Sequence, residues 1–209
     1  MAFSRIPGVS VEIVTKIFPE TPVKNIAANL PFVLNALVDA GLATREMILM
    51  ALATIRVEVA CFEPIGERES PLNTSPGGPA FDLYDYRSDL GNLGPPDGAT
   101  FRGRGFVQLT GRANYQFHGQ AIGVRDQLVT KPALASDPEI AAKLLASFIK
   151  RNQSGILAAL ATNDLAKARR CINGGTHGIA DFEEAYAAGI RLIPEHLEIL
   201  PSETLLIRA

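Results

Sequence analysis

FRGRGFVQLTGRANY, at residues 101–115, is the most informative stretch of the sequence, because glycine, arginine, amide and hydroxyl residues crowd into one short run. Gln108 and Thr110 are two residues apart and would share one face of an extended backbone. We expect that face to line a cleft. The apolar residues expected to anchor the stretch in a core are Phe106, Val107 and Leu109.

Two other classes of site share part of this pattern. A dinucleotide fingerprint needs a third glycine after Gly103 and Gly105, at the position that Gln108 occupies. An arginine-glycine segment that binds nucleic acid belongs in a basic, disordered context, whereas this chain has 20 Lys+Arg against 22 Asp+Glu. We therefore predict neither a dinucleotide cofactor nor a nucleic-acid partner.

The length of 209 residues suits one domain over 1–209, with room for two lobes about a cleft. No apolar run approaches the ~20 residues of a membrane span. The first eight residues lack a basic segment followed by an apolar core, so no signal peptide is visible. We expect a monomer without a membrane span, made in the cytoplasm and brought to its site of action by another route.

The sequence offers no clear metal site. Cys61 and Cys171 are too few for a disulfide scaffold and are expected to be buried thiols. The three histidines, His118, His177 and His196, are scattered along the chain. We therefore predict no metal and no cofactor.

Helix signals recur along the chain and predict a mostly α protein. Ser10 and Thr44 can each cap a helix, and Thr21-Pro22 can open another that Pro31 kinks or divides. Residues 1–50 would form supporting helices and 195–209 a tail. Three later helices are predicted to start at Asp137-Pro138, at Asn163 or Asp164, and at Asp181.

Glu58 is the first candidate for chemistry. It follows an almost wholly apolar helical run, 47–55, and Ile55 and Phe62 would share its face of the helix. Apolar surroundings disfavour a carboxylate anion, so such a group can hold a proton near neutral pH. The alternative is a structural glutamate paired with a buried arginine, Arg102 or Arg104.

Glu67 is the second candidate. Pro64 drives the residue before it out of helical geometry, so the chain can turn back and bring Glu67 to face Glu58. Inverting glycosidases need two carboxyl groups roughly 6.5–9.5 Å apart with a water between base and sugar. Glu63 and Glu69 are neighbouring carboxylates that could take the place of Glu67 as base.

The segment 70–100 is rich in Pro, Gly, Asn and Asp, and a loop of this length is usually functional. Its aromatic residues either anchor it or offer faces to sugar rings. The run from Arg102 to Tyr115 resembles the signature of glycoside hydrolase family 19, the chitinases and related phage-type endolysins. The match continues upstream, and the residues that carry it there are Tyr84, Arg87, Asp89, Gly91 and Asn92.

Further residues match the same family. Glu58, Phe62 and Glu67 resemble its arrangement of a catalytic acid, a following phenylalanine and a second glutamate. Residues 172–175 resemble its second cleft motif, although they also suit an ordinary glycine helix terminus. Val57 stands where the family usually has His, and Ala60-Cys61 replaces a Gly-Gly pair. These departures leave the acid in place and alter the expected shape of the cleft.

The resemblance implies a lysozyme-like helical domain with two lobes and a central cleft. It implies cleavage of β-1,4 bonds in N-acetylated aminosugar polymers, with peptidoglycan favoured, as in a bacteriolytic endolysin or muramidase, and chitin as the alternative. Glu58 would be the acid, Glu67 the base, and Thr110 would help to hold the water. The substrate would contact Gln108, Asn114, Tyr115, Asn173, Tyr84, Arg87 and Arg104. A lytic transglycosylase and an inactive sugar-binding protein remain alternatives.

Overall fold

The computed structural model describes residues 3–175 and 177–200, and in these residues the regular structure is helical, without a β-strand. The predicted mostly α class is confirmed. The chain divides into two compact units, one made of the residues up to Phe62 and from Ile149 onward, and the other of Glu63–Phe148. No helix in the described residues has both the length and the apolar character that a membrane span requires.

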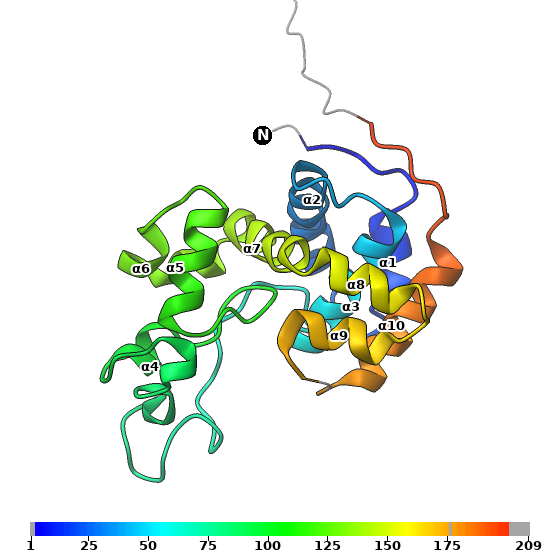
Figure 1. Cartoon of the computed structure of the whole chain (residues 1–209). Coiled ribbons are helices and arrows are strands. Elements are labelled where there is room, and N and C mark those ends of the chain that lie inside the picture. The colour runs from blue at the N-terminus through cyan, green and yellow to red at the C-terminus, as the bar shows by residue number, and fades with distance from the viewer. Residues whose placement is uncertain (1–2, 176, 201–209) are drawn as a thin grey trace, which may run out of the picture. The chain divides into compact units, whose positions relative to one another are not determined.

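The first unit is a bundle of helices around α3, Arg45–Glu58 (Figure 1). Residues 47–55 of α3 are all buried, as their apolar character predicts. Gly189, in α10 (Ile179–Leu192), lies so close to α3 that a Cβ on it would come within 2.1 Å of Leu49 Cδ2. The helices α10 and α3 therefore approach closely. The other helices are α1 Val11–Ile17, α2 Val23–Asp39, α8 Gln153–Leu160, α9 Leu165–Asn173 and α10 Ile179–Leu192.

Most of the predicted helix starts are confirmed. The hydroxyl groups of Ser10 and Thr44 accept hydrogen bonds from the backbone N–H groups of Ile13 and Met47. Asp164 caps α9 by accepting from Lys167 N–H, and Asp137 accepts from Glu139 N–H at the start of α7, Pro138–Arg151. These caps are local contacts over two or three residues, which is why the sequence reveals them.

Two helix boundaries differ from the prediction. Pro31 does not divide α2, which runs unbroken through it with buried residues before and after the proline, including Leu30 and Val33. Tertiary burial of this face outweighs the lost backbone hydrogen bond. The last helix starts at Ile179, after Gly178 in the left-handed region at φ 68°, so Asp181 lies in its first turn instead of capping it.

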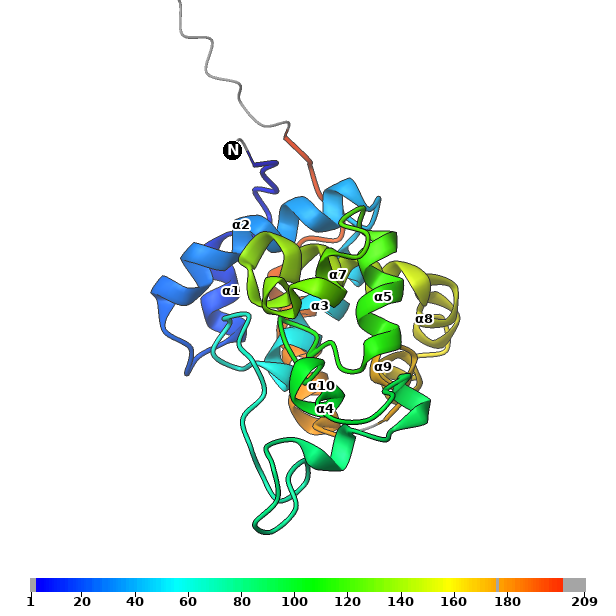
Figure 2. The ribbon, with the colours of Figure 1, turned by 90° about the vertical axis from the view of Figure 1, so that its left-hand side faces the viewer.

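The second unit carries shorter helices joined by long loops. Its elements are η1 Asp82–Tyr84, η2 Ser88–Leu90, α4 Asp97–Thr100, α5 Arg112–Ala121, α6 Gln127–Thr130, η3 Pro132–Ser136 and α7 Pro138–Arg151, which continues into the first unit. Figure 2 shows the loop before α4 as an irregular trace. Carboxylates fix this loop: Asp85 accepts from Gly98 N–H, and Asp97 binds Arg112 with Nε–Oδ2 at 2.7 Å.

The stretch 101–115 is anchored as predicted, because Phe106, Val107 and Leu109 are buried. Its backbone is not extended, however. It turns at Gly105 (φ 78°) and Gln108 (φ 50°), and Arg104 and Leu109 exchange backbone hydrogen bonds across the turn. Gly105 also donates its N–H to the carbonyl of Ile65. This distant partner and the glycine conformation override the alternation that suggested an extended segment.

Candidate active site

Glu58 is the last residue of α3, and its side chain is 19% exposed. The Nη2 atom of Arg169, on α9, donates to its carboxylate at 2.6 Å. The Arg169 side chain is 1% exposed, and its guanidinium lies over the ring of Phe182 at 5.6 Å. Glu58 is therefore held in a partly buried ion pair at the end of a rigid helix.

This ion pair corrects two expectations from the sequence. Glu58 does not sit among apolar neighbours alone, because a guanidinium touches it. Its partner is neither Arg102 nor Arg104, whose hydrogen bonds are made within the second unit. A sequence signal for Arg169 was available, since it falls on the apolar stripe of α9 that Leu165, Ala168 and Ile172 define at helical spacing.

Glu67 is held by donors from three segments of the second unit. Its Oε1 accepts from the Nδ2 of Asn73 and from the hydroxyl of Tyr84, each at 2.9 Å. Its Oε2 accepts from the backbone N–H of Gly103 at 3.0 Å. Sequence reasoning missed Asn73, whose place in the loop gives no local sign of this contact.

The close approach of the backbone at residue 103 to the Glu67 and Gln108 side chains explains why the Gly-Arg-Gly run begins with glycine. A Cβ at this position would lie 3.1 Å from Glu67 Oε2 and 2.8 Å from Gln108 Oε1. The backbone approaches the carboxylate closely enough to donate its N–H, and the Gly103 carbonyl also accepts from Glu67 N–H at 2.8 Å. Gly103 thus joins the motif directly to the candidate base.

Tyr84 contributes a donor whose proton is firmly held. Burial raises the pKa of Tyr84 to about 12, with further contributions from its hydrogen bond to Glu67 and from the negative charge of that carboxylate. The phenol therefore stays protonated at neutral and mildly basic pH, and it serves as a donor toward Glu67.

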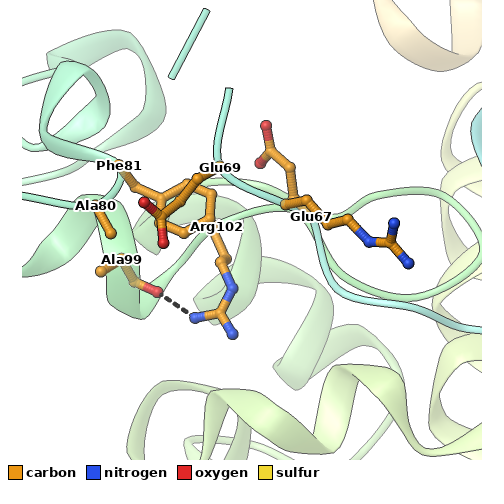
Figure 3. A pocket seen from close by; sticks show the side chains of 7 residues that line it. Glu67, Glu69, Ala80, Phe81, Ala99 and Arg102 are labelled. Carbon is orange, nitrogen blue, oxygen red and sulfur yellow. Dashed lines mark hydrogen bonds between the residues drawn. The ribbon is translucent and has the colours of Figure 1, made fainter. Parts of the chain in front are cut away.

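A pocket of about 470 Å³ lies beside Glu67 (Figure 3). The guanidinium of Arg102 lies over the ring of Phe81 at 5.3 Å and donates to the carbonyl of Ala99 at 2.9 Å. Glu69 lines the same pocket, so it remains a rival base by position, whereas Glu63 is not among the lining residues. The lining residues are Glu67, Arg68, Glu69, Ala80, Phe81, Ala99 and Arg102.

Three of the predicted cleft residues form a chain of hydrogen bonds along the turn. Gln108 donates its Nε2 to the carbonyls of Ile65 and Gly105, each at 3.0 Å. The Thr110 hydroxyl donates to the carbonyl of Gln108 at 2.9 Å, and Asn114 donates to the carbonyl of Thr110 at 2.8 Å. All three side chains are half-buried, so each keeps a part accessible to a ligand.

Two predicted sugar contacts do not fit the structure. Tyr115 is fully buried, and its hydroxyl donates to the carbonyl of Arg102 while accepting from Arg104. Arg104 is 7% exposed and also donates to the carbonyl of Thr100. Both side chains hold the turn together from inside, so a sugar has no access to the Tyr115 ring.

The remaining predicted contacts stay open. Arg87 is exposed and pairs with Asp89, with Nη2–Oδ2 at 2.6 Å, which leaves it available at the surface. Asn173 ends α9, but its side chain lies outside the described residues. Within the described ranges, no three His, Cys, Asp or Glu side chains gather as a metal would require.

No family model matches the chain. Its structure is similar to that of chitinase C from Streptomyces griseus HUT6037, with a TM-score of 0.56 and 20% identity over 88% of this chain and 75% of that chain. It is also similar to a mutant of chitinase C, with a TM-score of 0.61 and 19% identity over 88% and 76% of the two chains. These likenesses support the helical family 19 fold that the sequence motifs suggest.

Proposed function

We propose that this protein is a glycoside hydrolase that cleaves β-1,4 bonds in N-acetylated aminosugar polymers, with peptidoglycan ahead of chitin as substrate. The observation that carries the proposal is that both glutamates singled out by the sequence are partly accessible and held in place, Glu58 by Arg169 and Glu67 by Asn73, Tyr84 and Gly103. The fold shared with chitinase C supports the same reaction class.

Glu58 would act as the general acid. It must take up a proton before the step; it donates that proton to the glycosidic oxygen as the bond to the leaving sugar breaks, and it returns to the carboxylate that pairs with Arg169. Arg169 lies within hydrogen-bond distance and would compensate the negative charge that develops. A rigid helix end keeps the acid in one orientation, which favours proton transfer.

Glu67 would act as the general base. An ionised carboxylate offers about four lone-pair sites, and three donors occupy three of them, so one is left for a water molecule. The Thr110 hydroxyl uses its own proton on the carbonyl of Gln108. Toward a water it can therefore accept a hydrogen bond, and the second water proton would go to Glu67 as the oxygen attacks the sugar.

The test compares Glu58→Gln, Glu67→Gln and Glu69→Gln with the wild type on purified peptidoglycan and on chitin oligomers. Products are identified by mass, and the anomer formed is read by NMR. We expect the first two variants to lose hydrolysis and Glu69→Gln to keep most of it. Near wild-type hydrolysis by folded Glu58→Gln would overturn the proposal, and loss of activity in Glu69→Gln with retention in Glu67→Gln would make Glu69 the base.

A lytic transglycosylase is the second candidate, because three of the roughly four lone-pair sites of Glu67 already accept hydrogen bonds and at most one is left for a water. Such an enzyme needs a single acid and releases a 1,6-anhydro sugar. Mass spectrometry of the same digest separates the two reactions by the mass of one water. Tight oligosaccharide binding without turnover would instead establish a sugar-binding protein.

A further inference from the structure

Three polar side chains at the start of α2 hold the backbone that follows Glu58. Thr21 donates its hydroxyl to the carbonyl of Ala60. Asn25 donates its Nδ2 to the carbonyl of Cys61 at 2.9 Å, and Asn29 donates its Nδ2 to the carbonyl of Phe62 at 3.0 Å. The donors are four residues apart, and Asn25 and Asn29 are neighbours on one face of α2. We call these three residues the polar ladder.

The polar ladder is buried, with exposed fractions of 6% for Thr21, 7% for Asn25 and 6% for Asn29. Buried polar groups need partners, and each rung satisfies one donor and one carbonyl. The clamped carbonyls belong to Ala60, Cys61 and Phe62, which all lie beyond Glu58, the last residue of α3. The ladder therefore does more than cap the end of the helix. The ladder thus fixes the chain after the helix, residue by residue.

The clamped segment has a conformation that it would not adopt unaided. Phe62 has φ 55°, in the left-handed region that bulky residues rarely enter. Its N–H donates to the carbonyl of Val59 at 2.8 Å, which closes a turn, and its ring packs edge-on against Phe18 at 4.9 Å. Such a conformation persists when the surroundings over-determine it, and the polar ladder supplies that restraint.

Glu58 lies two residues before the first clamped carbonyl, while Arg169 holds its carboxylate from α9. We infer that Thr21, Asn25 and Asn29 are positioning residues for Glu58: the polar ladder fixes its backbone and thereby aims its carboxyl group. The inference rests on the proposed role of Glu58 as the acid. It differs from a purely stabilising role, because it requires the turnover of the folded enzyme to depend on the ladder.

The experiment uses Thr21→Val, which keeps the shape but removes the hydroxyl, and Thr21→Ser, which restores it. Asn29→Ala removes a second rung. Asn35→Ala is the control on the same helix, since the Asn35 side chain donates to Asp39 and accepts from Ser4 N–H, both away from the ladder. Each variant is assayed well below its melting temperature. We expect Thr21→Val and Asn29→Ala to lower kcat roughly 10-fold to 100-fold with a much smaller change in KM, because small misplacements of a reacting group cost rates of this order.

The thiol of Cys61 gives a readout that does not depend on activity. Cys61 lies in the clamped segment and is half-buried, so in a Cys171→Ser background its labelling rate reports how firmly the segment is held. We expect faster labelling in Thr21→Val and Asn29→Ala, and wild-type rates in Thr21→Ser and Asn35→Ala.

The outcomes separate this inference from the proposed function. Unchanged kcat in Thr21→Val and Asn29→Ala, beside an active wild type, overturns the positioning role and leaves the hydrolase proposal standing. Unchanged Cys61 labelling with lowered kcat also overturns it, because the ladder would not then be holding the segment. A wild type that cleaves neither polymer, including by transglycosylation, removes the proposed function itself, and this inference with it.

Discussion

Arg169 Nη2 and Glu58 Oε1 lie 2.6 Å apart and join α9 to the end of α3 across 111 residues of sequence. In the described part of the chain, Nε and Nη1 of Arg169 are buried and have no hydrogen-bond partner. The carboxylate of Glu58 is therefore the chief compensation for a guanidinium that has almost no contact with water. The pair matters to stability and to chemistry in different ways.

For stability, we expect the two partners to be unequal. Glu58→Ala leaves a buried guanidinium uncompensated and should lower the free energy of unfolding by about 3 kcal/mol. Arg169→Leu leaves a partly exposed carboxylate that water can reach, so its cost should be smaller. The double variant should be more stable than Glu58→Ala, as measured by urea unfolding. If the double variant is the least stable of the three, the ion pair does not account for the loss.

For activity, we expect Arg169→Leu to lower kcat roughly 100-fold, because Glu58 loses the group that orients it and compensates its charge. Arg169→Lys should recover part of this loss, since it keeps the charge and loses the planar fork. Circular dichroism shows whether each variant is folded at the assay temperature. Wild-type turnover by folded Arg169→Leu would show that the ion pair is structural.

The high pKa of Tyr84 gives a test of its contact with Glu67. The pKa of Tyr84 is raised to about 12, so its contribution to stability is fully present below pH ~10, the ordinary tyrosine value, and is lost as the pH rises toward 12. Glu67→Gln should lower the pKa of Tyr84 but leave it above the ordinary value, because burial is the largest cause of the shift. NMR titration of labelled tyrosine, assigned with Tyr84→Phe, measures this. An unmoved pKa in Glu67→Gln would contradict the contact.

Acid should weaken the second unit through Asp97. The hydrogen bond from Arg112 holds the pKa of the Asp97 carboxyl below its usual range, aided by Leu93 N–H and opposed by burial. Its stabilising contribution is present above pH ~4 and is lost as the pH falls through the lower pKa of the folded protein.

Asp97→Asn should therefore destabilise the protein at neutral pH and reduce the dependence of its melting temperature on pH below 4. Asp89→Asn is the matched control. Asp89 also pairs with an arginine, Arg87, but both side chains are largely exposed, so its loss should change stability little. Equal effects of the two substitutions would show that the burial of Asp97 does not strengthen its pair.

Local patterns in the sequence were enough to place much of the fold. Three features depend on neighbours within a few residues: the hydroxyl caps at Ser10 and Thr44, the buried helix α3, and the position of Glu58 at the end of α3. The same holds for Asp164 at the start of α9. Such features are visible because capping and amphipathic spacing are short-range effects.

The contacts of the candidate site were harder to foresee because they are made over long distances in sequence. Arg169 reaches Glu58 through the packing of the first unit, and Gln108 reverses direction because Gly105 turns and bonds to Ile65. Tyr115 shows a different failure. A motif gives the identity of a residue, but the fold decides which of its faces meets solvent, and here none does.

The main-chain donor to Glu67 has a genetic consequence. If either Asn73 or Tyr84 is replaced, Glu67 still keeps two donors. One of these is the backbone N–H of Gly103, a group that is removed only when proline replaces the residue. Glu58 has no such redundancy in the described residues, because its carboxylate relies on one side chain, Arg169. Random substitution of a neighbouring residue should therefore disable Glu58 more readily than Glu67. In a mutational scan for activity, position 169 should be among those that tolerate the fewest substitutions.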